Sequence, residues 1–207
     1  MTKEEFRDFS NRLFEFYNKQ KYADALDVAV EAARQFPEQS DRTHFWIACL
    51  QSRLGEHDKA IRTLRQTLLT GVWWSEDWLL GDSDILPLQN REDFKEILAE
   101  CGKRRREEEA NCKPGLSVLT PSEYHTAGAY PLLIALHGRG NDDADFTIDW
   151  KAVLAKGMIL AVPRSSQPMS SRTFRWDDLA KAEQEIVAAY STVKNSYSID
   201  ARKVIVA

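Results

Sequence analysis

The sequence has no long hydrophobic run, few cysteines and no large excess of charge of one sign. Its three cysteines, Cys49, Cys101 and Cys112, lie far apart and form no C-x-x-C pair, which argues against a disulfide framework and against a thiolate zinc site. The 28 basic and 32 acidic residues leave a formal net charge of -4. The chain therefore offers no general cationic field, and we expect no nucleic acid partner.

Other signals are missing as well. No apolar run approaches the roughly 20 residues that cross a bilayer, and Met1–Arg7 lacks the apolar stretch of a secretory signal. We therefore expect no membrane span and a cytoplasmic location. The four histidines show no metal-binding spacing, and Gly138-x-Gly140 lacks the third glycine of a dinucleotide fingerprint. We expect no metal and no cofactor.

The two halves of the chain differ in hydrophobic pattern. From Lys3 to about Glu109 the apolar residues fall at helical spacing and glycine is sparse, which predicts a helical domain over residues 1–109. From Lys113 onward short apolar runs alternate with helical stretches, which predicts a parallel α/β sheet over residues 110–207. The expected strands are Leu116–Leu119, Pro131–Leu136, Met158–Val162 and Val204–Val206.

The helical half contains an internal repeat. A shift of 35 residues places Tyr22–Leu26 on His57–Ile61, so that the small residues Ala25 and Ala60 coincide. Together with the helix-ending pair Phe36-Pro37, this pattern resembles tetratricopeptide repeats, and the segment from Asp82 through Cys101 resembles the cap that often follows such repeats. The resemblance implies a surface for a protein partner or for self-association.

Two clusters in this half have alternative interpretations. The run Lys103–Glu109 has three acids directly after its bases, which favours a solvated helix end or linker over a nucleic-acid or localisation signal. The cluster Trp73, Trp74 and Trp78 is either a binding surface or part of the core, and we expect it to pack against the cap helix.

The second half carries the chemistry. The apolar run Pro131–Leu136 leads into His137-Gly138-Arg139-Gly140, as expected of a buried strand that delivers a loop at its carboxyl end. A helical stretch follows and stops at Gly157. Asp177 or Asp178 caps a further predicted helix. The apolar stripe of that helix is Leu179, Ala182, Ile186, Tyr190 and Val193.

Several ordered motifs carry a family resemblance. They are the strand ending in His137-Gly138-x-Gly140, a strand ending in Pro163-Arg-Ser-Ser-Gln-Pro168, the turn Phe174–Asp178, and the segment Ile199–Ala207. This series resembles the first half of the α/β-hydrolase fold, and within it the phospholipase/carboxylesterase group of serine esterases. The resemblance implies hydrolysis of small-molecule carboxylic esters or thioesters through an acyl-enzyme, without a cofactor.

The resemblance also implies roles for individual residues. The N–H of Arg139, after Gly138, would be one of two donors to the oxyanion of the tetrahedral intermediate. His137 and Gly140 would shape this loop, and the alternative is that the loop is only a tight strand-exit turn. Trp176 and Asp177 would line the substrate pocket, although Trp176 is equally compatible with a place in the core.

No catalytic nucleophile is expected in the sequence as given. In the family that it resembles, a G-x-S-x-G serine follows the strand that corresponds to Val204–Ala207, and the acid and histidine come later. The loop serines Ser165, Ser166, Ser170 and Ser171 lack the flanking glycines. We therefore expect a fragment of a longer hydrolase that is inactive alone. The alternative is a noncatalytic helical-repeat binding module with a vestigial hydrolase tail.

Overall fold

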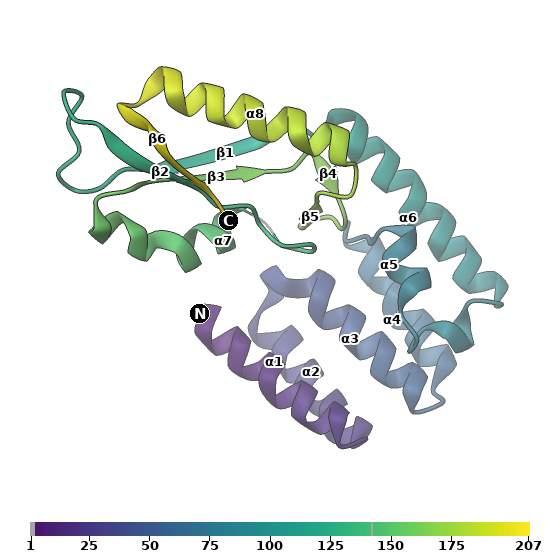
Figure 1. Cartoon of the computed structure of the whole chain (residues 1–207). Coiled ribbons are helices and arrows are strands. Elements are labelled where there is room, and N and C mark those ends of the chain that lie inside the picture. Colours follow the sequence, from purple (N-terminus) through teal and green to yellow (C-terminus); the bar gives the residue numbers. More distant parts are fainter. Residues whose placement is uncertain (1–2, 142) are drawn as a thin grey trace. The chain divides into compact units, whose positions relative to one another are not determined.

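The computed structural model describes residues 3–141 and 143–207, which form two compact units, Met1–Glu107 and Glu108–Ala207 (Figure 1). The first is built of helices and the second of a sheet with helices. The protein thus combines an N-terminal helical domain with part of an α/β-hydrolase-like fold. Across the described part of the chain, no helix combines the length and apolarity that membrane crossing requires.

The helical unit consists of short antiparallel helices joined by tight turns. Its elements are α1 (Lys3–Asn18), α2 (Tyr22–Gln35), α3 (Ser40–Arg53), α4 (His57–Leu69), α5 (Glu76–Gly81) and α6 (Glu92–Asn111), with 3-10 turns at Pro37–Gln39 and Leu86–Leu88. Helix α1 packs on α2, α2 on α3 and α3 on α4. As predicted from Phe36-Pro37, α2 ends at Gln35.

Helices α2 and α4 keep the 35-residue spacing seen in the sequence. They begin at Tyr22 and His57, and the residues before them, Lys21 and Glu56, have similar backbone dihedrals. The equivalent residues Ala25 and Ala60 are both fully buried. Small side chains at these positions allow the neighbouring helices to approach closely.

The tryptophans pack into the core of this unit, which confirms the packing interpretation. Trp73 and Trp74 are buried in one cluster with Phe94, Ile97 and Cys101 of α6, and Trp78 packs against it. The indole Nε1 of Trp74 donates a hydrogen bond of 2.7 Å to the carbonyl oxygen of Asp41, which satisfies its buried polar atom.

The basic run in α6 is less solvated than the sequence pattern predicts. Lys103 pairs with Glu107 four residues on, as expected, at 4.0 Å. Arg104 instead bonds back to Glu100 and to the carbonyl oxygen of Leu68, and Arg105 pairs with Glu76 of α5 at 2.7 Å. These arginines fasten α6 to neighbouring helices, because their long side chains reach partners distant in sequence.

The second unit is built on a four-stranded sheet of order β1-β3-β2-β6. The strands are β1 (Gly115–Leu119), β2 (Tyr130–Ile134), β3 (Ile159–Arg164) and β6 (Ile199–Val206). β2 runs parallel to both β3 and β6, but β1 is antiparallel to β3, so the sheet is mixed and not all parallel as predicted. The connection from β1 to β2 contains no crossover helix, which suits this reversal.

Helices cover both faces of the sheet (Figure 1). α7 (Asp143–Trp150) and the 3-10 helix Lys151–Lys156 pack through Trp150 and neighbouring apolar residues on one face, that of Leu133 and Leu160. α8 (Leu179–Ser196) packs through Val193 on the opposite face. The central strands are therefore buried on both sides.

Two predicted details of this unit are corrected or sharpened. Asp178 caps α8, since its side chain accepts a hydrogen bond from the Lys181 N–H. Leu179 was expected in the buried stripe of α8 but is 76% exposed, and Glu185 takes a place on the buried face instead. A short hairpin that was not predicted, β4 (Gln167–Pro168) with β5 (Phe174–Arg175), precedes the helix.

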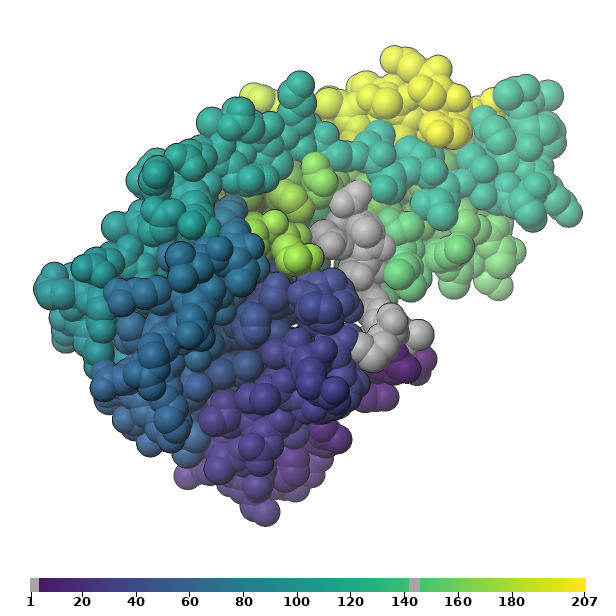
Figure 2. Space-filling view, turned by 180° about the vertical axis from the view of Figure 1, so that it is seen from behind, coloured from purple at the N-terminus to yellow at the C-terminus, as the bar shows by residue number. Residues whose placement is uncertain are grey.

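β6 lies at the edge of the sheet. Within the described residues it pairs only with β2, and its last side chains, Ile205 and Val206, are 52% and 56% exposed. Figure 2 shows the last part of the chain (yellow), which includes the end of α8, at the surface of the C-terminal unit.

Candidate functional site

The candidate site is the loop that follows β2 at the carboxyl edge of the sheet. The three last residues of β2 are almost completely buried, and the chain continues through Ala135 and Leu136 before it turns at His137. β6 runs parallel on one side of β2 and β3 on the other. Because parallel strands deliver their carboxyl ends to one edge, loops here meet at the usual ligand-binding edge of an α/β sheet.

Hydrogen bonds to the backbone fix the His137 ring. The ring is 2% exposed, and its Nε2 accepts a bond of 3.2 Å from the Ser165 N–H. Because Nε2 is an acceptor, the neutral ring carries its proton on Nδ1, which donates 3.0 Å to the Gly138 carbonyl oxygen. The imidazole thus holds the turn in place, as the structural role expected for this histidine requires.

The loop itself is a tight turn. The Asn141 N–H bonds to the Gly138 carbonyl oxygen at 3.2 Å, and Gly140, the third residue of the turn, has a φ of +78°. A positive φ at this place is the mark of a type II turn and strongly favours glycine. The glycine at position 140 is therefore explained by backbone geometry.

Residues of β5 and the segment after it hold the loop from the other side. The Gly140 N–H donates to the Phe174 carbonyl oxygen at 2.9 Å. The Trp176 indole donates to the His137 carbonyl oxygen at 3.1 Å, and the two rings lie 4.9 Å apart at 30°. Trp176 thus contacts the loop directly and is partly buried.

Charged side chains lie at the outer side of the loop. Asp177 is about half exposed, and its carboxylate lies 3.5 Å from Nε of Arg139 and 3.4 Å from a guanidinium nitrogen of Arg175. The structure therefore brings together all six residues singled out in the sequence: His137, Gly138, Arg139, Gly140, Trp176 and Asp177.

Behind the loop lies a buried polar segment that sequence reasoning treated only as a loop. Glu185 of α8, 9% exposed, accepts hydrogen bonds from both the N–H and the hydroxyl of Ser166. Ser165 accepts from the Gln167 N–H, and Ser170 bonds to Thr173. These hydroxyls serve to build the turn after β3. Glu185 was missed, although an acid between Ala182 and Ala189 on the buried face of a helix is a signal of such a role.

The end of β6 lies directly beside the start of this loop. The Ala207 N–H donates to the Ile134 carbonyl oxygen at 3.0 Å, and the Leu136 N–H donates to the Ala207 carbonyl oxygen at 2.7 Å. Two neighbouring parallel strands therefore deliver their carboxyl ends to the same place.

A helical domain followed by a sheet whose central strand β2 leads into a glycine turn is the arrangement expected of an α/β-hydrolase-like protein. Residues 5–111 match the family model described as "A/B hydrolase-like, N-terminal domain". The matched segment makes up just over half of the chain, so the chain belongs to this family. The match covers the helical part of the chain.

The other comparisons say less. No curated protein matches the chain. Among solved structures, the chain is similar to an uncharacterized protein from Bacillus cereus ATCC 10987, with 23% sequence identity and a TM-score of 0.49. The similarity covers 100% of this chain and 64% of that protein.

Proposed function

We propose that this chain belongs to a cytoplasmic serine hydrolase that cleaves small carboxylic esters or thioesters through an acyl-enzyme. The chain contributes the helical domain and one wall of the active site. The loop His137–Gly140 supplies half of the oxyanion hole, through the N–H of Arg139. The attacking serine comes from residues that follow Ala207 in a longer protein, so the 207-residue chain is inactive alone.

The adjacency of β2 and β6 carries this proposal. Ala207 is hydrogen-bonded to Ile134 and Leu136, which come just before the Arg139 loop in the chain. A segment that follows β6 therefore begins beside that loop in space. A serine in a strand-to-helix turn at that point could attack an acyl carbonyl while the N–H of Arg139 binds the carbonyl oxygen. Acyl transfer needs this arrangement.

The surroundings of the loop support a binding role for two further side chains. Trp176 lies on the loop with its indole bonded to the His137 carbonyl oxygen, and Asp177 is half exposed beside Arg139. We propose that these two residues line the substrate pocket. The tetratricopeptide-like helical unit recruits a protein partner or a second copy, since stacked helix pairs present extended binding surfaces.

The test exploits the fact that the proposed donor is a backbone group. Arg139→Pro removes the N–H at the second position of a type II turn, where proline is favoured and the fold is retained. In a longer protein that continues past Ala207 and holds the proposed serine, we expect kcat for a p-nitrophenyl ester to fall by about 100-fold to 1,000-fold. The KM should change little, because the donor acts in the transition state.

Arg139→Ala is the matched control, since it removes the same side chain but keeps the N–H. It should retain kcat within a few-fold. Equal losses in the alanine and proline variants would contradict a role for the backbone donor. Turnover of the ester by the 207-residue chain alone, blocked by an organophosphonate, would contradict the location of the nucleophile.

A further inference from the structure

The helical unit contains a cavity of about 440 Å³ that the proposed hydrolase chemistry does not use. It lies among α1, α3, α5 and the segment that follows α5, and its volume falls within the range of small-molecule sites. Its walls are rich in aromatic side chains, namely Phe14, Tyr17, Phe45, Trp46 and Trp78. Asp82 and Asp84 also line it.

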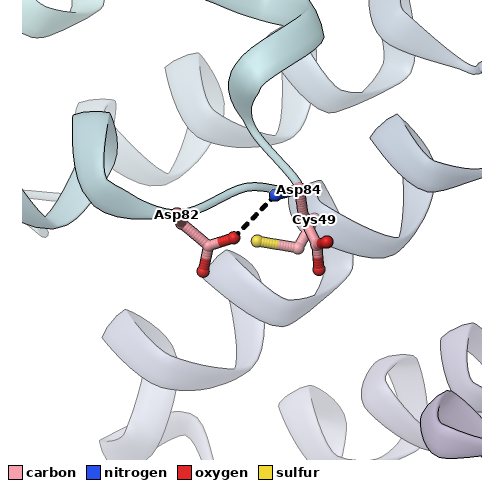
Figure 3. Close-up of side chains that lie close together, drawn as sticks. All are labelled: Cys49, Asp82 and Asp84. Atoms are coloured by element: carbon pink, nitrogen blue, oxygen red, sulfur yellow. Dashed lines mark hydrogen bonds between the residues drawn. The ribbon is translucent and has the colours of Figure 1, made fainter.

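Three side chains that line this cavity, those of Cys49, Asp82 and Asp84, lie close together, as Figure 3 shows. Ligand-type atoms of Cys49, Asp82 and Asp84 lie within 4.8 Å of one another. Cys49 comes from α3, and the two aspartates come from the segment after α5. The Asp84 N–H donates to the Asp82 carboxylate at 2.8 Å, which orients the Asp82 side chain.

The two carboxylates differ in charge compensation. Asp84 accepts hydrogen bonds from the Arg53 guanidinium and, at 2.9 Å, from the Tyr17 hydroxyl. Asp82 is half-buried and makes no ion pair with any residue that the structure describes. With Arg53 balancing Asp84, the cavity keeps one uncompensated negative charge, that of Asp82.

Cys49 is the third member of the cluster. Its thiol lines the cavity, is 6% exposed and forms no hydrogen bond within the described ranges 3–141 and 143–207. Burial raises the pKa of this thiol well above its ordinary value, so it stays protonated. Because Asp84 is already bound by Arg53 and Tyr17, Cys49 and Asp82 alone offer fewer protein ligands than a zinc site needs.

We propose that this cavity binds a monovalent organic cation, with its ammonium group against the carboxylate of Asp82 and its apolar stem among the aromatic rings. Aromatic faces attract cations, and the charge of the ligand matches the single uncompensated carboxylate. Burial raises the pKa of Asp82, and a bound ammonium group would reverse that effect. A free arylalkylamine and a lysine side chain of a partner share this chemistry.

Calorimetric titration of the full 207-residue chain tests the proposal with four probes. Phenethylammonium represents a free amine and N-acetyl-lysine methylamide a protein side chain, and the tighter of the two identifies the source. 2-Phenylethanol has nearly the shape of phenethylammonium but no charge. We expect it to bind at least about tenfold more weakly. Zn²⁺ tests the metal alternative.

Asp82→Asn supplies the decisive variant, because the amide oxygen still accepts the Asp84 N–H while the charge is lost. Affinity for the ammonium probes should fall at least about tenfold, and the melting temperature should stay equal or rise, since an uncompensated half-buried charge is removed. Asp27→Asn is the matched control. It removes the same charge from an exposed position of α2 outside the cavity, and affinity should not change.

Four results would overturn the proposal. They are equal affinity for 2-phenylethanol and phenethylammonium, unchanged affinity in the Asp82→Asn variant, absence of binding by either ammonium probe, and stoichiometric Zn²⁺ binding that Cys49→Ser abolishes. The last of these would establish a metal site in its place.

Discussion

At the scale of single residues, Glu185 connects α8 to the loop that supports the candidate site. Its carboxylate accepts two hydrogen bonds from Ser166, and the neighbouring Ser165 N–H in turn positions the His137 ring. A buried charged acceptor is costly unless it is satisfied, and here it is. The orientation of the His137 loop therefore depends on a side chain of α8 that does not contact the loop's histidine directly.

Replacement of Glu185 by glutamine should expose this dependence. The amide oxygen still accepts the Ser166 N–H, and the NH₂ group can donate to the Ser166 hydroxyl oxygen, so two neutral hydrogen bonds replace two bonds to a carboxylate. We expect a loss of about 1 kcal/mol in the free energy of unfolding. Urea denaturation followed by circular dichroism measures it. Glu183→Gln, an exposed neighbour on the same helix, should change stability by less than about 0.5 kcal/mol. Equal stability of the two variants would show that the negative charge of Glu185 adds nothing to its bonds with Ser166.

The residue scale also shows where sequence reasoning stops. The glycine pattern of the loop and its neighbours Trp176 and Asp177 could be identified because motif order carries that information. The Cys49, Asp82 and Asp84 cluster could not, since Cys49 lies more than thirty residues before the two aspartates and meets them only through the packing of α3 against the segment after α5.

At the scale of elements, hydrophobic period predicts which segments are helices and strands, but not their directions. The strand Gly115–Leu119 was expected from its apolar run, yet nothing in that run specifies that it pairs antiparallel to β3. The hairpin of β4 and β5 was missed because two residues per strand show no period.

Helix length explains the misplaced residue of α8. The 18 residues of α8 span about 27 Å, whereas a strand of six residues spans about 20 Å. The helix is thus longer than the central strands that it covers. Leu179 lies in the first turn of α8 at the spacing of the apolar stripe, but no strand lies beneath it.

The repeated helices α2 and α4 allow a matched prediction. Ala25 and Ala60 are equivalent and fully buried, so leucine at either position overpacks a close helix contact. We expect Ala25→Leu and Ala60→Leu each to cost about 1–3 kcal/mol in the free energy of unfolding, measured by chemical denaturation. Ala23→Leu, at an exposed position of α2, should change the free energy of unfolding very little. A cost at only one of the two buried sites would show that the two helices pack differently despite their spacing.

At the scale of the whole molecule, the change of pattern in the sequence near Glu109 predicts a helical first half and an α/β second half, and the structure has both. The boundary between the two compact units lies between Glu107 and Glu108, whereas α6 continues to Asn111. The boundary therefore falls within a helix. Composition alone could not show this, since a charged helix end and a charged linker look alike in sequence.

The position of β6 leads to the last prediction. β3 is paired on both sides, with β1 and β2, and its first four residues are at most 1% exposed. β6 is paired with β2 alone among the described residues, and its end is half exposed. Amide exchange depends on local opening, so in the 207-residue chain the amides of β6 should exchange at least about a hundredfold faster than those of β3. Mass-spectrometric hydrogen exchange on both segments measures this ratio.

In a longer protein that adds a strand next to β6, the protection of the β6 amides should rise toward that of the β3 amides. Equal protection of β6 and β3 in the 207-residue chain would contradict the prediction. It would mean that the free edge of β6 is already covered, for instance by a second copy of the chain.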